Sequence, residues 1–473
     1  MIILGTNSIK ATGYDVANSV RFNDGDSPRM HKTPSGAGNR RKFTISAWVK
    51  RGSNLGANSY IFDARVDGSD NAPFQFNTSD QIFFRTKVGG SSYYIQTNRV
   101  FRDVSAFYHL AIVYDNTLGT AGDRIQLWVN GVRETSFADS TMPDQDTDTT
   151  VNNASVVQTV GSEGGGASFF DGYISEFVLL DGTADSPVDT LGSFDEDSGI
   201  WKPIDVSGLT FGTNGFYLDF EDSANLGNDA NGGTDLTEVN LAATDQSTDT
   251  CTNNFATWNS LQPTNATMTE GNLVGASSAS SGHYSGLSTI GVTSGKWYFE
   301  CKQIQESTTG EGIIGAVIFY NTVTALLNPE GRGGAWGIKA QGRGFQTDSG
   351  GSGSTTNSFT AGWSNNDTIG IALDIDNSRI YFSKGGQWNN SGSWNAANPT
   401  TSQTLQNALG DGTYFFFAGD ASGSNNNTWS ANFGSPAHAI SSGNTDGNGY
   451  GNFEYAVPSG YFSLNTKNLA EYG

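Results

Sequence analysis

Cysteine and histidine are scarce in this sequence. Its 473 residues include two cysteines, Cys251 and Cys301, and four histidines. Two thiols are too few for a disulfide framework or a cysteine-based zinc site. The histidines lie far apart in the sequence, which argues against a histidine metal centre. We expect two unpaired thiols, with a bridge between them as the alternative.

Positive charge and long apolar runs are also missing. Lys and Arg number 25 against 47 Asp and Glu, a net charge of −22. A surface of this sign repels polyphosphate, so nucleic acid is excluded as a partner. No segment is long and apolar enough for a membrane-spanning helix. The start, Met1–Gly5, has no basic residue and three apolar residues in a row, so we expect neither a signal peptide nor membrane insertion.

Glycine and aromatic residues, by contrast, are abundant. The chain has 61 glycines, and aromatic residues make up 12% of it. Many short apolar runs are separated by Gly, Asn and Asp, which is typical of β-sandwiches and barrels. The length exceeds what one hydrophobic core supports. We therefore predict an all-β chain of two antiparallel β-sandwiches.

The strand patterns of the first half occur in a characteristic order. In Phe43–Lys50, alternate residues are apolar, and Asn130-Gly131 is a strong hairpin-turn signal. In this order the strands resemble the laminin-G-like, concanavalin-type jelly rolls. The residues that carry the resemblance are Phe43–Lys50, His109–Asp115, Leu127–Gly131 and Gly172–Phe177.

The second half is similar to a different β-sandwich family. Its most specific segment is Asp367–Gly385, in which two apolar strands flank a turn at Asp376-Asn377-Ser378. With Lys296–Glu300, Gly315–Val317 and Ala335–Gly337, this segment resembles a SPRY domain. The resemblance implies a sandwich that binds partners through loops at one end.

These patterns divide the chain into four parts. We expect an N-terminal docking arm over 1–20, a concanavalin-like jelly roll over 21–200, and a SPRY-like sandwich over 266–473. Residues 201–265 hold apolar anchors such as Phe216, Leu218 and Phe220 within a polar stretch. This pattern predicts a packed connector with one or two strands.

The combination of the two modules resembles predicted structural proteins of marine bacteriophages. The segments Asn18–Gly25, Phe211–Phe220 and Thr466–Leu469 add to the likeness. It implies a place in the virion, on tail or capsid surface, and attachment to a host-cell glycan or protein. The other expected partners are virion proteins and sister subunits, with a homotrimer favoured. The arm holds an apolar patch formed by Ile2, Ile3 and Leu4. Burial of this patch would favour docking of the arm on a virion protein or a sister subunit.

Ligand contact is expected from tryptophans in polar loops. Aromatic ring faces stack on sugars and lose little conformational entropy on binding. Trp388 and Trp394 stand in a polar stretch with Asn389 and Asn390, whose amides can bind hydroxyl groups; Trp363 is an alternative. These tryptophans could equally fasten the loop to the sandwich.

Calcium is the one metal that the acidic loops could hold, because Ca²⁺ prefers hard oxygen ligands. The candidate pairs are Asp63 with Asp67 and Asp115 with Asp123. A further candidate is the acidic loop of Asp139, Asp144, Asp146 and Asp148. Solvated acidic loops are the alternative, and no other cofactor is expected.

We expect no enzymatic activity. Retaining glycoside hydrolysis needs two carboxyl groups about 5 Å apart, and the nearest same-face pairs are Asp219 with Glu221 and Asp374 with Asp376. Both pairs stand at strand ends, where Asp normally accepts backbone hydrogen bonds. A polysaccharide depolymerase is the alternative from the enzyme class. A purely architectural protein without a ligand is the third.

Overall fold

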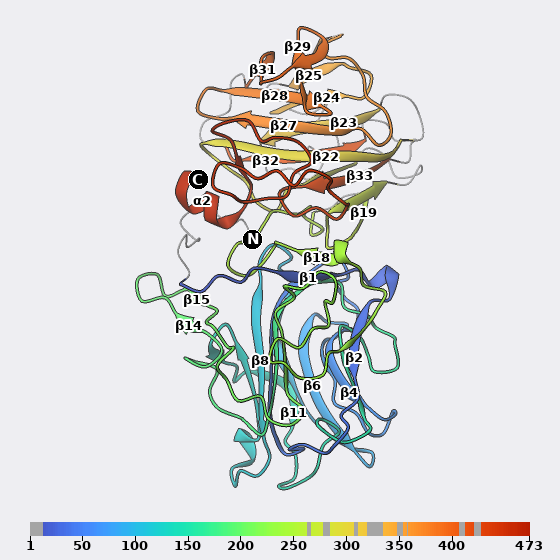
Figure 1. Cartoon of the computed structure of the whole chain (residues 1–473), viewed down its shortest axis with the longest axis vertical. Helices are drawn as coiled ribbons and strands as arrows, with labels where there is room; N and C mark the ends of the chain where they lie inside the picture. The colour runs from blue at the N-terminus through green and yellow to red at the C-terminus, as the bar shows by residue number, and fades with distance from the viewer. Residues whose placement is uncertain are drawn as a thin grey trace. The chain divides into compact units, whose positions relative to one another are not determined.

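The computed structural model describes residues 13–262, 266–277, 284–306, 311–318, 334–347, 353–356, 358–405, 412–420 and 427–473. The chain divides into two compact units, with the boundary between Thr252 and Asn253. In the described ranges nearly all regular structure is β-strand (Figure 1). The predicted all-β fold class is confirmed. No helix of the described chain is long and apolar enough to span a membrane.

The first unit is a sandwich of two eight-stranded antiparallel sheets. In the first sheet, the strands are β10 (Val132–Arg133), β9 (Ile125–Val129), β8 (Tyr108–Asp115), β3 (Lys42–Arg51), β13 (Gly172–Asp181), β1 (Ser19–Phe22) and β18 (Gln246–Ser247), with β16 (Phe216–Leu218) also on β13. In the second sheet, they are β11 (Phe137–Thr141), β7 (Ser91–Val100), β6 (Gln81–Val88), β5 (Phe74–Phe76), β4 (Ser59–Arg65), β12 (Val157–Val160), β2 (Arg29–Lys32) and β17 (Thr237–Val239).

Alternation of apolar residues decides which face of each strand enters the core. In β6, Ile82 and Phe84 are fully buried, whereas Phe83 and Arg85 between and beyond them are partly exposed. The hairpin expected at Asn130-Gly131 joins β9 to β10, with φ of 48° and 73°. A Cβ at Gly131 would lie 2.2 Å from the Trp201 ring, so glycine is required there for space as well as for backbone conformation.

The connector expected over 201–265 is not a separate segment. Up to Thr252 it belongs to the first unit, where β16 pairs with β13, β17 with β2 and β18 with β1. The segment begins with β15 (Trp201–Lys202), which pairs with β14 (Ser193–Phe194) in a small two-stranded sheet. Backbone pairing to both large sheets makes this segment part of the sandwich. The expected arm also ends earlier, because β1 is an inner strand; Ile2, Ile3 and Leu4 lie outside the described residues.

The second unit has a ten-stranded and a six-stranded sheet. In the larger sheet, the strands are β19 (Ala266–Thr269), β20 (Val274–Ser277), β33 (Asn427–Asn432), β22 (Lys296–Glu306), β27 (Thr368–Asp374), β28 (Arg379–Lys384), β29 (Gln387–Asn390) and β30 (Ser393–Ala396), with β31 (Ser402–Thr404) on β28 and β34 (Phe462–Ser463) on β22. In the smaller sheet, they are β21 (Tyr284–Leu287), β32 (Tyr414–Asp420), β23 (Gly312–Ile318), β24 (Ala335–Lys339), β25 (Gly344–Thr347) and β26 (Gly353–Thr356).

A buried carboxyl group ties the C-terminal segment to the larger sheet of this unit. Glu300 of β22 accepts hydrogen bonds from the backbone N–H groups of Glu454 and Tyr455 and from the Tyr298 hydroxyl. Burial raises the pKa of Glu300 to about 7. The chain then ends in α2 (Thr466–Tyr472), whose N-cap, Asn465, accepts from the backbone N–H of Asn468.

Candidate functional site

Three of the five residues expected to contact a ligand are buried. Trp388 is 3% exposed and packs against Tyr298, with ring centroids 6.3 Å apart. Asn389 is buried and donates to the Phe359 carbonyl, and Trp363 is buried with its indole N–H on Gln303. A ring without solvent access cannot stack on a sugar, so the expectation is corrected for these three.

The polar stretch around them is a hairpin of β29 and β30 rather than a loop. Asn390 is exposed and Trp394 is half-buried on its surface. The indole nitrogen of Trp394 is shielded and has no hydrogen-bond partner. Of the predicted ligand residues, these two remain accessible, and their role stays a prediction.

The four aspartates expected to bind calcium do not form the predicted pairs of ligands. Asp63 is fully buried and bound by Arg65 at 2.7 Å, while Asp67 accepts backbone N–H groups of its own turn. Asp123 is paired with Arg133 at 2.8 Å. Across the described ranges, no three His, Cys, Asp or Glu side chains come together as a metal site requires. Basic side chains take the place that a cation would occupy.

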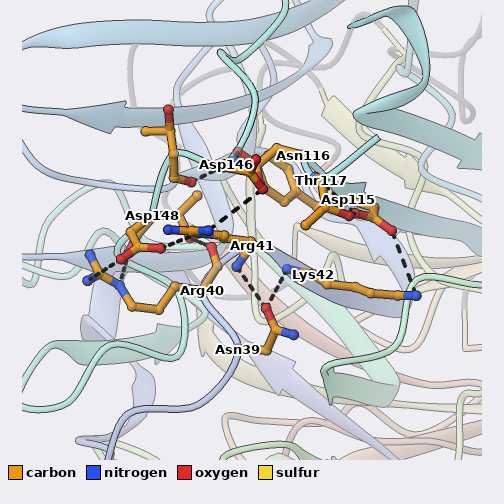
Figure 2. Close-up of polar contacts among 12 residues, drawn as sticks. Asn39, Arg40, Arg41, Lys42, Asp115, Asn116, Thr117, Asp146 and Asp148 are labelled. Atoms are coloured by element: carbon orange, nitrogen blue, oxygen red, sulfur yellow. Dashed lines mark hydrogen bonds and ion pairs between the residues drawn. The ribbon is translucent and has the colours of Figure 1, made fainter. Parts of the chain in front are cut away.

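Figure 2 shows the same pairing around Asp115 and the acidic loop. Lys42 lies 3.7 Å from the Asp115 carboxylate. Arg41 lies between Asp146 and Asp148, at 3.7 and 2.6 Å. These ion pairs neutralise the carboxylates and position the loop beside β3. They leave Asp115, Asp146 and Asp148 in a structural role.

The two carboxylate pairs considered for catalysis stabilise turns. Asp219 accepts the backbone N–H of Glu221 at 3.1 Å. Asp374 accepts from Asn377 and lies 2.9 Å from the Lys296 ammonium group. Both arrangements match the backbone-capping role that aspartate commonly has at strand ends.

The first unit presents a different cluster on the outer face of its second sheet. Four residues are directly paired across β4, β5, β6 and β7, so their side chains share one face: Tyr60 with Gln75, Gln75 with Phe83, and Phe83 with Gln96. The next pair along the strands is Arg85 with Tyr94. We call this surface the β6–β7 face and define it by these residues: Tyr60, Gln75, Phe83, Arg85, Tyr94 and Gln96.

Aromatic and polar groups alternate on the β6–β7 face. The rings of Phe83 and Tyr94 have centroids 5.8 Å apart, and the Arg85 guanidinium lies 5.8 Å from the Phe83 ring centroid. The Tyr94 hydroxyl donates to Asp139 at 2.8 Å. Burial, with nearby Glu163 and Asp63, raises the pKa of Tyr60 to about 12, so its hydroxyl remains a donor. The face can therefore stack a ring and hydrogen-bond its substituents.

Two buried acceptors near this face lack partners. The Gln75 side chain donates to Asn58, but its Oε1 has no hydrogen-bond partner, and Asp63 Oδ1 has none either. Buried polar atoms are nearly always satisfied, so these two acceptors call for a partner. Sequence alternation in β6 and β7 could have shown that Phe83, Arg85 and Tyr94 point outward. Their assembly with Tyr60 and Gln75 depends on cross-strand register, which the sequence does not reveal.

A small pocket lies on the outer face of the first sheet. Its lining includes Trp48, His109 and Glu176. Glu176 has φ of 49° at a bulge in β13, and its carboxyl accepts from the Tyr217 hydroxyl at 2.8 Å. Burial lowers the pKa of His109 to about 3, and its Nε2 contacts the Ser46 hydroxyl at 2.8 Å. A neutral, enclosed imidazole fits the packing role expected for a histidine within an apolar strand.

Glu176 should make the stability of the first unit depend on pH. Burial above all, and then the nearby Asp219 carboxylate, raise its pKa from 4.5 to about 8, although the hydrogen bond from Tyr217 acts in the opposite direction. Between these values the folded unit keeps a proton that the unfolded chain releases, so the free energy of unfolding falls as pH rises from about 5 to 8. Glu176→Gln should flatten this dependence. Urea unfolding of the wild type and of Glu176→Gln at pH 5 and pH 8 measures this change in the free energy of unfolding. An equal change in the two proteins would contradict the prediction.

Comparison with known proteins confirms the concanavalin-type domain. Residues 25–186 match the family model described as the concanavalin A-like lectin/glucanases superfamily, of laminin G type. The first half of the chain therefore contains a concanavalin A-like/laminin G domain. No curated protein matches the chain.

Several solved structures are similar to parts of the chain. The SPRY domain of human HERC1 is 15% identical, with 34% of this chain and 87% of that one covered and a TM-score of 0.26. The PSpry domain of TRIM65 is 14% identical; the match covers 37% of this chain and 91% of that one, with a TM-score of 0.27. Domain 4 of the GH43 arabinanase AbnA from Geobacillus stearothermophilus, solved with arabinotriose, is 18% identical. The match covers 32% of this chain and 66% of that one, with a TM-score of 0.24. Scores below 0.5 say nothing of what this chain binds.

Proposed function

We propose that this chain is a non-enzymatic carbohydrate-binding protein whose first unit holds the sugar on the β6–β7 face. The observation that carries the proposal is the cross-strand row of Tyr60, Gln75, Phe83 and Gln96. It places aromatic rings and amides side by side on one sheet face. The concanavalin A-like lectin/glucanase description of the domain supports the same ligand class.

The chemistry of the face suits a pyranose or furanose ring. The C–H face of a sugar packs on the ring of Phe83 or Tyr94, which loses few rotamers on binding. The Gln96 amide lies beside Phe83 in the row and can exchange hydrogen bonds with hydroxyl groups, whereas Gln75 is buried and does not contact the ligand. Gln96 now donates to Gln81 at 2.7 Å, a bond between neutral side chains that a ligand hydroxyl can replace.

We further propose that the protein works on the surface of a virion, on tail or capsid, as an attachment or decoration subunit. The support is the resemblance of its module order and its segments Asn18–Gly25, Phe211–Phe220 and Thr466–Leu469 to marine phage structural proteins. In this setting its partners are sister subunits, other virion proteins and a glycan of the host-cell surface. Antibody labelling of purified particles from the source virus tests the location; absence of label would oppose it.

Removing the rings should weaken binding. Phe83→Ala and Tyr94→Ala are each expected to lower affinity for a glycan found on an array by about two- to tenfold, since such ring contacts contribute about 0.5–1.5 kcal/mol and tenfold corresponds to 1.4 kcal/mol. Both side chains lie on the outer face, so the fold should persist. Isothermal titration calorimetry measures the effect.

Trp394→Ala serves as the matched control, because this half-buried ring belongs to the second unit. If Trp394→Ala weakens binding and the two substitutions in the first unit do not, the sugar site lies on the second unit instead. Incubation of the bound polysaccharide with the protein should release no new reducing ends. Release of reducing ends would favour the depolymerase.

A further inference from the structure

Arg85 stands out on the β6–β7 face because its guanidinium makes no direct ion pair within the described residues; the carboxylates of Asp63 and Glu163 act on its charge only from a longer distance. Its Nε and one Nη donate to the same neutral acceptor, Asn71 Oδ1, at 3.2 and 2.6 Å. No acidic side chain of the described chain lies within ion-pair distance of it. Asn71 is 1% exposed, so this contact anchors the guanidinium from below. The remaining Nη group has no hydrogen-bond acceptor among the residues that the structure describes.

The neighbouring arginine shows the usual arrangement in this acidic chain. Arg65 lies 2.7 Å from Asp63 and 3.1 Å from Glu163. With 47 acidic and 25 basic residues, acceptors for arginine are plentiful. Arg85 is nevertheless half-buried and held by an amide, beside an aromatic ring and next to Tyr94 in register. A pre-positioned guanidinium with a spare donor edge fits an anion that presents two neighbouring oxygens.

We propose that the glycan taken by the β6–β7 face is acidic, and that Arg85 binds its carboxylate or sulfate groups while the sugar ring packs on Phe83. This inference rests on the proposed function and adds the class of sugar. Carboxylate and sulfate share the oxygen geometry that arginine recognises. The half-buried Gln96 of the row then hydrogen-bonds the hydroxyl groups of the same sugar.

The net charge of −22 disfavours general binding of polyanions, so an acidic glycan must be held by local contacts, and this sharpens the test. At physiological ionic strength, repulsion between charges is largely screened beyond about 8 Å. Recognition by Arg85 acts within hydrogen-bond distance and is affected little. An acidic chain has no general attraction for polyanions, so retention of an acidic polysaccharide reports a specific contact.

The test uses the full chain and matched pairs of probes: alginate with its carboxyl-reduced form, and dextran sulfate with dextran. We expect one acidic probe to bind at least tenfold more tightly than its neutral counterpart. Arg85→Gln should reduce that affinity about tenfold and remove the selectivity. Arg85→Lys keeps the positive charge but lacks the paired N–H donors of the guanidinium, so its affinity should lie between those of the wild type and Arg85→Gln. Arg99→Gln removes an equal charge from exposed Arg99 on β7 and should change neither value.

The outcomes separate this inference from the proposed function. If folded Arg85→Gln protein still prefers the acidic probe, the proposed role of Arg85 is wrong. Equal binding of neutral and acidic probes, lost in Phe83→Ala, overturns the acidic ligand but keeps the sugar face. Binding of no probe by the folded wild type, with no glycan found on the array, overturns both.

Discussion

Asp249→Ala is expected to lower the free energy of unfolding of the first unit by about 3–5 kcal/mol, because it leaves a buried ammonium group without its carboxylate. Lys50 Nζ lies 2.8 Å from Asp249 Oδ2, and each side chain is 1% exposed. Lys50 also lies over the rings of Tyr173 and Phe107, at 5.5 and 5.9 Å.

The ion pair links distant parts of the chain. Lys50 stands near the end of β3, whereas Asp249 follows β18, the last strand of the first unit. The backbone carbonyl of Asp249 also accepts from the Ser19 hydroxyl at 2.7 Å. The pair therefore fastens residues 246–250 to the first sheet, and its loss should release that segment first.

Hydrogen exchange with mass spectrometry measures this prediction, since it reports the two units separately. The control is Arg133→Ala, which breaks the exposed pair with Asp123 and should cost less than about 1 kcal/mol. The double variant Lys50→Met with Asp249→Leu should be more stable than Asp249→Ala alone, because no buried charge remains. A cost for Asp249→Ala no larger than that of Arg133→Ala would contradict the prediction.

Trp388→Ala is expected to destabilise the second unit by about 3–5 kcal/mol, the usual cost of deleting a large buried aromatic side chain. Trp388 packs in one apolar cluster with Tyr298, Phe453 and Tyr461. Two of these, Phe453 and Tyr461, belong to the C-terminal segment that follows β33. The ring therefore helps to join this segment to the ten-stranded sheet.

Thermal unfolding combined with hydrogen exchange of residues 427–473 measures the effect. Trp394→Ala in the same hairpin is the control, because Trp394 is half-buried and should cost clearly less. Phe453→Ala should expose the same segment, since Phe453 packs on Tyr298 within the cluster that contains Trp388. Unchanged stability in Trp388→Ala, together with lost glycan binding, would restore this tryptophan as a ligand residue.

The outcome for Trp388 shows where sequence patterns stop being informative. Gln387–Trp394 is rich in Asn, Ser and Gly, and these residues suggested an exposed loop. The turn at Ser391-Gly392 instead joins two short strands, and Trp388 enters a cluster that includes Phe453, 65 positions further along the chain. Local composition shows that a segment is polar. It does not show which side chains a distant segment will cover.

The acidic side chains illustrate the same limit. Asp63, Asp115 and Asp123 were candidates for calcium because of their type and spacing, but each has an arginine or lysine within 4 Å. In the pairs of Asp63 with Arg65 and Asp123 with Arg133 the partners are close in sequence, whereas Lys42 reaches Asp115 across the β3–β8 ladder. A partner on a neighbouring strand, such as Lys42, can be identified only when the strand order and register are known.

The sequence by itself determined the all-β class, the concanavalin-type first domain and the hairpin at Asn130-Gly131. It could do so because alternation, turn residues and motif order are local properties of the chain. The tertiary structure alone decided that residues up to Thr252 complete the first sandwich, that Trp388 and Trp363 are buried, and that Phe83, Tyr94 and Arg85 share a face. Those features depend on register between strands, and register is set by long-range pairing in the folded chain.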